Sequence, residues 1–343
     1  MKTYEVKQTA GVLLNANESP FPLPAMIREE VKARVDDIDF HRYPQDSAKA
    51  LRASYGSYLH INADQILFGN GSDEMIGFLI GHFIHQGKCV YTLQPDFSMY
   101  DYYTAIHDGK ILTYPCDGAQ PFSVSDFITY GKQNEVDLIL FSNPNNPTGR
   151  WLAPKEIHQI LDAFPTIPII VDEAYGEFAP ASIVHDVDQY ENLIVLRTLS
   201  KAFGIAALRC GCMITNLQRM KQLRPHKVPY NVNSLTQMIA ELVLTHHEIM
   251  AENVKTIIGQ RELLYKELQA FSEAGLTIFP SEANFLYGKT ARKHELFAAL
   301  KKHQIYIRDY ANSDAFRITI GTPDENKMMI ETFAEVFSHK EDL

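Results

Sequence analysis

The segment Leu193-Ile-Val-Leu-Arg-Thr-Leu-Ser-Lys-Ala-Phe-Gly204 joins a short apolar run to a lysine that stands among hydroxyls and small residues. The run Leu193 to Leu196 is typical of a strand covered on both faces of a sheet. Lys201 follows this strand, whereas surface lysines usually stand in charged company, as Lys301 and Lys302 do. An amine held in a desolvated pocket has a lowered pKa and can attack a carbonyl group. A single lysine of this kind is structural in most proteins, so the interpretation depends on its companions.

Further short apolar runs flank this strand and alternate with helical patterns. Strands are predicted over residues 65–68, 88–92, 110–114, 138–141, 167–171 and 193–196. Helical patterns lie between several of them, for example over 73–85, 98–106 and 154–164. Because apolar strands with helical crossovers bury both faces of a sheet, these patterns predict a doubly wound α/β core with a mostly parallel sheet.

A different pattern begins near Leu235. A long, charged, amphipathic stretch runs to about Ala274 and is followed by strands over 277–279, 284–287, 305–307 and 316–320 and helices over 295–302 and 325–338. This order predicts a smaller α+β domain. Residues 1–40 carry too little apolar pattern to stand alone, so we expect them to pack on it. The domain prediction is residues 41–243 for the large domain, and 1–40 with 244–343 for the small one.

Composition argues against several classes of protein. The 343 residues are 45% hydrophobic and 22% charged, as in globular proteins, so disorder is not expected as the main state. The formal net charge of −10 argues against nucleic-acid binding, although arginines can still cluster at a local anion site. No run approaches the ~20 apolar residues that span a membrane, and the first residues lack the apolar stretch of a signal peptide. We therefore expect a cytoplasmic protein.

Neither a metal site nor a disulfide is expected. Cys89, Cys116, Cys210 and Cys212 lack zinc-ribbon spacing, and the last two are too close in sequence for a standard disulfide. They are interpreted as reduced thiols that serve as small packing groups. The histidine pairs at 82/85 and 246/247 have no set of carboxylates at zinc spacing.

Three segments fall at predicted strand ends, where open α/β sheets bind ligands. Gly69-Asn-Gly-Ser-Asp-Glu74 lies before a helix whose free N–H groups attract phosphate, with an ordinary helix start as the alternative. Asp172-Glu-Ala-Tyr175 supplies a carboxylate, either for a buried cation or as a helix cap. In Ser142-Asn-Pro-Asn-Asn-Pro-Thr-Gly149, two Asn-Pro steps predict a rigid turn. From this turn Asn143 or Asn146 can present its amide to an oxygen on the ring of a bound ligand.

A lysine amine, a carboxylate and a phosphate-binding turn are together what pyridoxal phosphate requires. Its aldehyde needs an amine, its pyridine nitrogen needs an anion, and its phosphate needs N–H groups, hydroxyls and an arginine. The motifs S-N-P-N-N-P-T-G, V-D-E-A-Y, R-T-L-S-K-A-F-G and L-R-C-G, in this order, resemble those of a fold-type I aminotransferase. They are most similar to the histidinol-phosphate aminotransferase family. Matches at residues 14–20, 41–44, 69–74 and 316–321 extend the resemblance over nearly the whole chain.

The resemblance implies a PLP-dependent transferase fold of the aspartate aminotransferase kind, with a role for each matching residue. Lys201 is expected to bond to the cofactor aldehyde and, once freed by the substrate, to move a proton between the substrate Cα and the cofactor. Asp172 is expected to pair with the pyridinium nitrogen. Tyr175 and Asn146 are expected to bind the ring hydroxyl oxygen. Phe97 is expected to stack on the ring, where many relatives carry Tyr.

The resemblance also implies how the cofactor phosphate is held. Backbone N–H groups and side chains are expected to bind it, contributed by Ser72, Asp73, Thr198, Ser200 and Arg209. Tyr43 resembles the tyrosine that reaches the cofactor phosphate of the neighbouring subunit. This match implies an obligate homodimer with shared active sites.

Substrate binding is implied at three positions. Arg317 matches the arginine that binds the substrate α-carboxylate, because a guanidinium presents paired donors. Arg308 matches an arginine that meets the substrate phosphate, with a surface ion pair to Asp309 as the alternative. Asn17 is expected at the pocket rim, where Ser19-Pro20-Phe21 departs from the family pattern and makes the rim bulkier and more apolar.

The predicted function is therefore a PLP-dependent aminotransferase. The family's named reaction converts histidinol phosphate and 2-oxoglutarate to imidazole-acetol phosphate and glutamate. An aromatic amino acid aminotransferase and a decarboxylase of threonine phosphate share this scaffold and stay as alternatives. A binding protein that has kept the scaffold is a further alternative, which the presence of Lys201, Asp172 and Arg209 disfavours.

Overall fold

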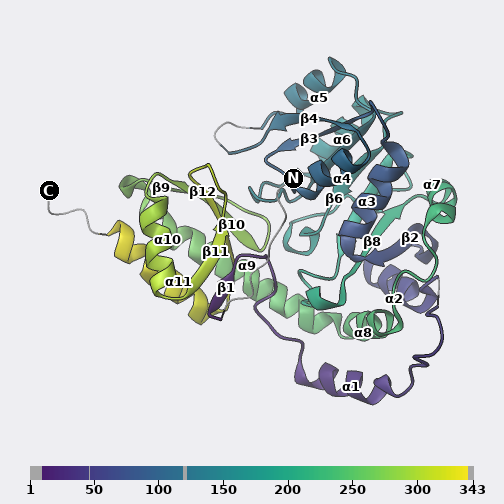
Figure 1. Ribbon diagram of the computed structural model, residues 1–343, viewed down its shortest axis with the longest axis horizontal. Coiled ribbons are helices and arrows are strands. Elements are labelled where there is room, and N and C mark those ends of the chain that lie inside the picture. Colours follow the sequence, from purple (N-terminus) through teal and green to yellow (C-terminus); the bar gives the residue numbers. More distant parts are fainter. Residues whose placement is uncertain (1–9, 46, 119–121, 339–343) are drawn as a thin grey trace.

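The computed structural model describes residues 10–45, 47–118 and 122–338, which form two sheets with their covering helices. The strands are β1 (Val12–Leu14), β2 (Ile66–Asn70), β3 (Cys89–Gln94), β4 (Lys110–Pro115), β5 (Leu138–Ser142), β6 (Ile169–Asp172), β7 (Leu193–Thr198), β8 (Cys210–Thr215), β9 (Leu276–Phe279), β10 (Phe285–Thr290), β11 (Ile305–Asp309) and β12 (Ala315–Thr319). The α-helices are α1 (Ala25–Val35), α2 (Lys49–Leu59), α3 (Gly71–Phe83), α4 (Met99–Ile106), α5 (Val124–Lys132), α6 (Pro154–Ala163), α7 (Leu217–Leu223), α8 (Ser234–Thr245), α9 (His247–Gln269), α10 (Lys293–Lys302) and α11 (Pro323–Phe337). Figure 1 shows the two sheets with α9 running between them.

The larger sheet has seven strands in the order β2-β8-β7-β6-β5-β3-β4. The strand pairs from β7 to β4 are parallel, and only β8 runs antiparallel to its neighbours β2 and β7. The predicted α/β fold with a mostly parallel sheet is confirmed. The sequence did not identify β8, because Cys-Gly-Cys-Met-Ile-Thr contains few of the β-branched and aromatic residues that mark strands.

Helices cover both faces of this sheet, which explains why its central strands are apolar at every position. Leu138 and Leu140 on β5 pack on the face covered by α3, α4 and α7, next to Ile76. The alternate residues Ile139 and Phe141 pack on the opposite face, which is covered by α2, α5, α6 and α8. Successive side chains of a strand point to opposite faces, so a strand between two helical layers needs apolar residues throughout.

The smaller sheet has the order β1-β11-β12-β10-β9, with β1 parallel to β11 and the other pairs antiparallel. Helices α9, α10 and α11 pack on it and bury Leu264, Leu300 and Phe333 in one cluster with Phe316 of β12. The last helix, α11, begins at a capping box: the Glu325 N–H donates to the Thr322 hydroxyl (3.3 Å), and the Thr322 N–H donates to the Glu325 carboxylate (2.8 Å).

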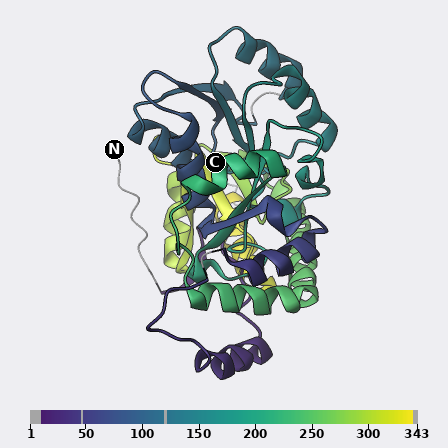
Figure 2. The same cartoon turned by 90° about the vertical axis from the view of Figure 1, so that its right-hand side faces the viewer.

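The assignment of residues to two domains stays a prediction. Residues 1–9 and 339–343 of the expected small domain lie outside the described residues. Of the segment 10–40, β1 joins the smaller sheet, whereas α1 lies beside α8 at one end of the molecule, as both views show (Figures 1 and 2). The long stretch expected from 235 to 274 forms two helices that are separated at His246. No helix within the described ranges is long and apolar enough to cross a membrane.

Candidate active site

The expected cofactor residues lie at one edge of the larger sheet. Asp172 ends β6, Thr198 ends β7, and Asn146 and Lys201 follow β5 and β7 directly. Phe97 follows β3. These strands are parallel, so their carboxyl ends meet at the same edge and bring together residues that are far apart in sequence.

The amine of Lys201 points between the larger sheet and the N-terminal segment. Its Nζ donates to the carbonyl oxygen of Ala16 (3.0 Å) and lies 6.0 Å from the ring centre of Tyr175. Burial lowers the pKa of Lys201 to about 8, and the nearby charge of Arg317 adds to the lowering. The neutral, nucleophilic amine is therefore far more populated near neutral pH than in an exposed lysine, although the protonated form still predominates.

Asp172 is 3% exposed, and each of its two carboxylate oxygens accepts a hydrogen bond. Oδ1 accepts from the Ala174 N–H (3.1 Å), and Oδ2 accepts from the Tyr100 hydroxyl (2.9 Å). Burial raises the pKa of Asp172 to about 6, and these two donors act in the opposite direction. The carboxylate is thus a buried anion at neutral pH, and such a group favours a cationic partner.

Tyr175 and Asn17 are joined although they lie on loops that follow strands of different sheets, β6 and β1. The Asn17 Nδ2 donates to the Tyr175 hydroxyl (2.8 Å), and the Asn17 Oδ1 accepts from the Thr319 hydroxyl (3.1 Å). Asn17 has a φ of 55°, a left-handed conformation that asparagine tolerates. It is 1% exposed, so it lies deeper than the rim position expected from the sequence.

Arg317 on β12 faces the cofactor segment that follows β5. Its Nη1 donates to the Asn146 Oδ1, its Nη2 donates to the carbonyl oxygen of Asn15 (3.0 Å), and its guanidinium lies 5.2 Å from the ring centre of Phe285. The Nε atom of Arg317 is buried and has no hydrogen-bond partner. A buried guanidinium with a spare donor is suited to binding an anion.

Arg308 lies next to Arg317 across the smaller sheet. The two residues are directly opposite each other on the antiparallel strands β11 and β12. Directly opposed residues on neighbouring strands point to the same face of a sheet, so Arg308 lies on the same face as Arg317. The carboxylate of Asp309, the alternative partner considered for Arg308, accepts from Lys293 Nζ (2.7 Å).

The start of α3 has the features of a phosphate-binding turn. Its N-cap residue Asn70 makes no side-chain cap, and Gly71 at its first position has a φ of 81°. A Cβ atom at Gly71 would lie 2.6 Å from the Arg209 Nη2, so the guanidinium sits directly over this turn. Arg209 also pairs with Asp73 (2.9 Å). Free N–H groups and a cation at a helix start together attract a phosphate.

The hydroxyls of the lysine loop lie close to one another. Thr198 and Ser200 are both buried, and their hydroxyl oxygens are 3.0 Å apart. The charges of Asp73 and Arg209 at the phosphate-binding turn also act on the pKa of Lys201, Asp73 raising it and Arg209 lowering it. A nucleophilic amine, a buried carboxylate, a spare guanidinium donor and an uncapped helix start in one place fit pyridoxal phosphate.

Comparisons with known proteins agree with this geometry. The family model for "Aminotransferase class I and II" matches residues 9–333. A histidinol-phosphate aminotransferase from Clostridium kluyveri is 36% identical over 336 residues, covering 97% of this chain and 93% of the relative. The chain belongs to the histidinol-phosphate aminotransferase family of class I and II aminotransferases.

Solved structures show the same fold. The histidinol-phosphate aminotransferase from Clostridium acetobutylicum superposes with a TM-score of 0.86 at 23% identity, covering 96% of this chain and all of the other. The enzyme from Sinorhizobium meliloti, in complex with pyridoxal-5'-phosphate, gives 0.85 at 21% identity, covering 96% and 91%. The predicted resemblance and fold are confirmed, and the chain is a PLP-dependent aminotransferase.

Two residues of this aminotransferase site were missed by the sequence analysis. Tyr100 on α4 donates to Asp172, and its ring meets that of Phe97 edge-on at 5.7 Å between centres. Asp96 accepts hydrogen bonds from the Phe97 N–H (2.8 Å) and from the Ser142 backbone and side chain. The sequence analysis named only Phe97 from residues 95–100, because nothing local indicates which strand end the other side chains of this segment reach.

Tyr43 lies outside this cluster. Its side chain is 82% exposed and stacks on Tyr230, with 4.9 Å between ring centres. Exposed apolar side chains of Phe40 and Val228 belong to the same two segments. The role expected for Tyr43 requires a second subunit and stays a prediction.

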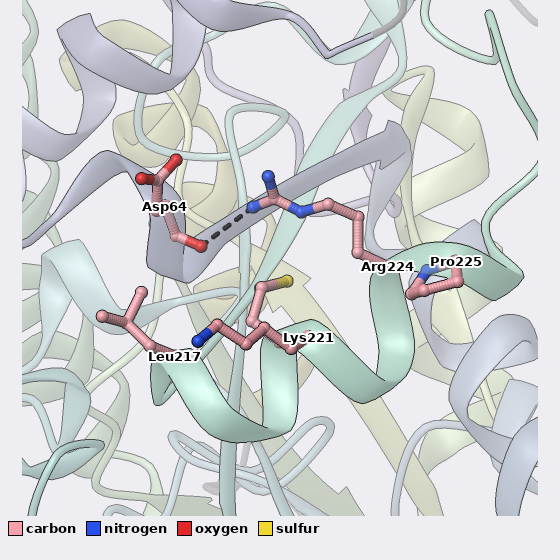
Figure 3. A pocket seen from close by; sticks show the side chains of 6 residues that line it. Asp64, Leu217, Lys221, Arg224 and Pro225 are labelled. Carbon is pink, nitrogen blue, oxygen red and sulfur yellow. Dashed lines mark hydrogen bonds between the residues drawn. The ribbon is translucent and has the colours of Figure 1, made fainter.

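One cavity of the molecule is remote from these residues. It has a volume of about 520 Å³ and lies between α7 and the turns next to it (Figure 3). Its lining residues are Asp64, Leu217, Met220, Lys221, Arg224 and Pro225, none of which is an expected site residue. Over the described ranges, no three His, Cys, Asp or Glu side chains lie together as a metal site.

Proposed function

We propose that this aminotransferase moves an amino group from histidinol phosphate to 2-oxoglutarate, giving imidazole-acetol phosphate and glutamate. Curated relatives that carry the name histidinol-phosphate aminotransferase are 32–36% identical over nearly the whole chain. The observation that carries the proposal is the position of Arg317. Arg317 has a spare buried donor, and its charge acts on the amine of Lys201, which supports a site that binds a substrate amine together with a nearby anion.

Lys201 is proposed to move a proton at the substrate Cα. Pyridoxal phosphate, when bound, supplies an electron sink that stabilises negative charge at that carbon. With a pKa lowered to about 8 by burial, the Lys201 amine can both accept and return this proton near neutral pH.

Asp172, Tyr175, Asn146 and Phe97 are proposed to hold the cofactor ring. The buried anion of Asp172 favours a protonated pyridine nitrogen. Tyr175 and Asn146 present a hydroxyl and an amide at neighbouring strand ends, and both are held from the smaller sheet's side, by Asn17 and Arg317 respectively. Phe97 supplies an apolar face at the end of β3.

The remaining contacts concern two anionic groups. The cofactor phosphate is proposed to bind at the start of α3 and its surroundings, through Ser72, Asp73, Thr198, Ser200 and Arg209. The substrate anion is proposed to bind at Arg317 and Arg308. The phosphate of histidinol phosphate and the α-carboxylate of glutamate both lie close to the reacting amine, so one pair of arginines can serve both half-reactions.

We also propose a cytoplasmic homodimer in which Tyr43 reaches the cofactor phosphate of the other subunit. Tyr43 and Tyr230 form an exposed aromatic stack, a feature that is typical of interfaces. Cys89, Cys116 and the two cysteines of β8 are free thiols, as is usual in a reducing compartment.

A panel of amino donors tests the substrate. With 2-oxoglutarate as acceptor, we expect kcat/KM for histidinol phosphate to exceed that for phenylalanine by at least about 100-fold, because a site built for a phosphate is left unpaired without it. Threonine phosphate should release no carbon dioxide. Good turnover of phenylalanine without turnover of histidinol phosphate would overturn the proposal.

Variants separate the two arginines. Arg308→Ala should raise KM for histidinol phosphate by about tenfold and KM for glutamate by less, whereas Arg317→Ala should raise both. Arg292→Ala is the control, because Arg292 at the start of α10 pairs with Glu295 (2.5 Å). Equal effects of Arg308→Ala on both donors would contradict the role of Arg308.

A further inference from the structure

The carboxylate of Asp172 is held by one donor from its own turn and by a second donor, Tyr100, from a different element. The Tyr100 hydroxyl donates to Oδ2 of Asp172 (2.9 Å), while the Ala174 N–H donates to Oδ1 (3.1 Å). The Ala174 bond belongs to the turn that follows β6 and is local. The Tyr100 bond joins residues 72 apart in sequence, on α4 and β6. With both oxygens held, the carboxylate cannot rotate freely.

Tyr100 is itself immobilised. It is 1% exposed and packs in the cluster that α3, α4 and α7 form on one face of the larger sheet. Its ring stands at 90° to that of Phe97, the residue expected to stack on the cofactor ring. One segment, residues 97–100, therefore carries both the apolar face for the ring and the donor for the carboxylate opposite its nitrogen. A displacement of α4 would move both together.

The charges around Asp172 explain why a donor is needed there. Negative groups act on Asp172 from two elements, Asp73 on α3 and Glu173 after β6. Asp96 after β3 is also close, but burial raises its pKa to about 8, so near neutral pH it is mostly uncharged. Burial and these neighbours raise the pKa of Asp172, and the Tyr100 hydroxyl acts against them. Burial also raises the pKa of Tyr100 well above its ordinary value, so the hydroxyl keeps its proton and stays a donor.

We propose that Tyr100 is a positioning residue whose hydroxyl holds the Asp172 carboxylate ionised and turned toward the pyridine nitrogen of the cofactor. The proposal rests on the role proposed for Asp172. It assigns to the Pro95 to Tyr100 segment a second task besides ring stacking, and it predicts that the hydroxyl alone, without any change of packing, controls how tightly the cofactor binds.

The test compares two tyrosines that each lose a buried hydroxyl. Tyr100→Phe removes the donor to Asp172. Tyr91→Phe is the matched control, since Tyr91 is fully buried on β3 and its hydroxyl donates to the backbone oxygen of Phe127 (2.8 Å), away from the cofactor residues. Apoprotein of each variant is titrated with pyridoxal phosphate, and binding is followed by the fluorescence of Trp151, the only tryptophan of the chain.

We expect Tyr100→Phe to bind the cofactor about tenfold more weakly at pH 8, the usual effect of losing one hydrogen bond to a charged group. The loss should be larger at pH 6, because the pKa of Asp172 rises without its donor and the carboxyl becomes neutral. Tyr91→Phe should bind within about twofold of the wild type at both pH values. Both variants should lose a similar amount of thermal stability. Tyr100→Leu gives a second hydroxyl-free variant if Tyr100→Phe does not fold.

A double-mutant cycle completes the test. In an Asp172→Asn background, Tyr100→Phe should not weaken cofactor binding further, because the charged acceptor is absent. Equal weakening by Tyr91→Phe and Tyr100→Phe, or additive effects of Tyr100→Phe and Asp172→Asn, would overturn the inference. Its failure is distinguishable from failure of the proposed function, since a wild-type protein that binds cofactor tightly but ignores histidinol phosphate leaves the titration result intact.

Discussion

The environment of Lys201 shows how burial and charge adjust one side chain for chemistry. A lysine exposed to water is almost wholly protonated at neutral pH and cannot act as a nucleophile or base. After the end of β7 the amine is buried, and both burial and the charge of Arg317 lower its pKa. The amine donates a hydrogen bond to the carbonyl oxygen of Ala16. The same burial that activates the amine must cost stability, because the folded apoprotein disfavours the charged form.

This cost gives a prediction for the apoprotein. Lys201 has a pKa of about 8 when folded, against an ordinary 10.5, so unfolding takes up a proton between these values and stability rises with pH in that window. Below about pH 8 the cost is fully present. We therefore expect Lys201→Met apoprotein to be more stable than the wild type by about 2 kcal/mol at pH 7, with the difference vanishing by about pH 10.5.

Thermal unfolding of apoprotein between pH 6.5 and 10.5 measures this difference. Lys302→Met serves as the control, because Lys302 on α10 has an exposed side chain. Its stability difference from the wild type should not change with pH in the same way. A constant difference for Lys201→Met across the pH range would contradict the prediction.

At the scale of elements, one close contact joins the cofactor loop to the smaller sheet. The segment after β5 ends at Gly149, whose carbonyl oxygen accepts from the Glu282 N–H (2.9 Å) in the turn between β9 and β10. Gly149 has a φ of 74°, and a Cβ atom there would lie 2.9 Å from the Cα of Ser281. A cavity of about 270 Å³ opens beside this contact. The loop that carries Asn146 is thus tied to the sheet that carries Arg317.

Gly149→Ala should weaken this contact between the loop after β5 and the turn between β9 and β10. We expect a loss of about 2–3 kcal/mol in the free energy of unfolding, from the left-handed backbone and the clash with Ser281 together. Gly275→Ala is the matched control, since Gly275 has a φ of 88° and open space around it, and should cost only about 1 kcal/mol. Denaturant unfolding compares them; equal losses would show that the contact with Ser281 is unimportant.

At the scale of the whole molecule, an exposed aromatic surface stands apart from the core. The segments 40–43 and 228–230 carry Phe40, Tyr43, Val228 and Tyr230, all at least 47% exposed. Tyr43 and Tyr230 stack on each other, and exposed aromatic side chains are typical of interfaces. The surface is therefore where we expect a second copy of the chain to bind.

Val228→Asp tests this expectation. If this surface is the interface, a charge at Val228 loses its hydration there without gaining a partner, so the variant should dissociate to monomers at micromolar concentration and bind cofactor more weakly. Leu263→Asp is the control, because Leu263 is 44% exposed but lies on α9, outside the segments 40–43 and 228–230. Sedimentation equilibrium of the holoenzyme measures the mass. A wild-type protein that is monomeric would overturn the homodimer itself.

The sequence was informative about the elements that carry strong local signals. Apolar strands β5, β6 and β7, the turn of Ser142 to Gly149 and the start of α3 were all predicted near their observed positions. Elements with weak local signals were not predicted correctly. β1 has three residues, β8 has a Cys-Gly-Cys start, and His246 interrupts what reads as one long helix.

The amino-acid sequence by itself determined the fold class, the strand-end motifs and the family, because these depend on short apolar runs, on Gly and Pro, and on motif order along the chain. Only the tertiary structure decided which distant side chains meet. Asn17 reaches Tyr175 across 158 residues, and Tyr100 reaches Asp172 across 72. Such contacts depend on the order of strands in a sheet and on the packing of one sheet against the other, and neither has a local signature in the chain.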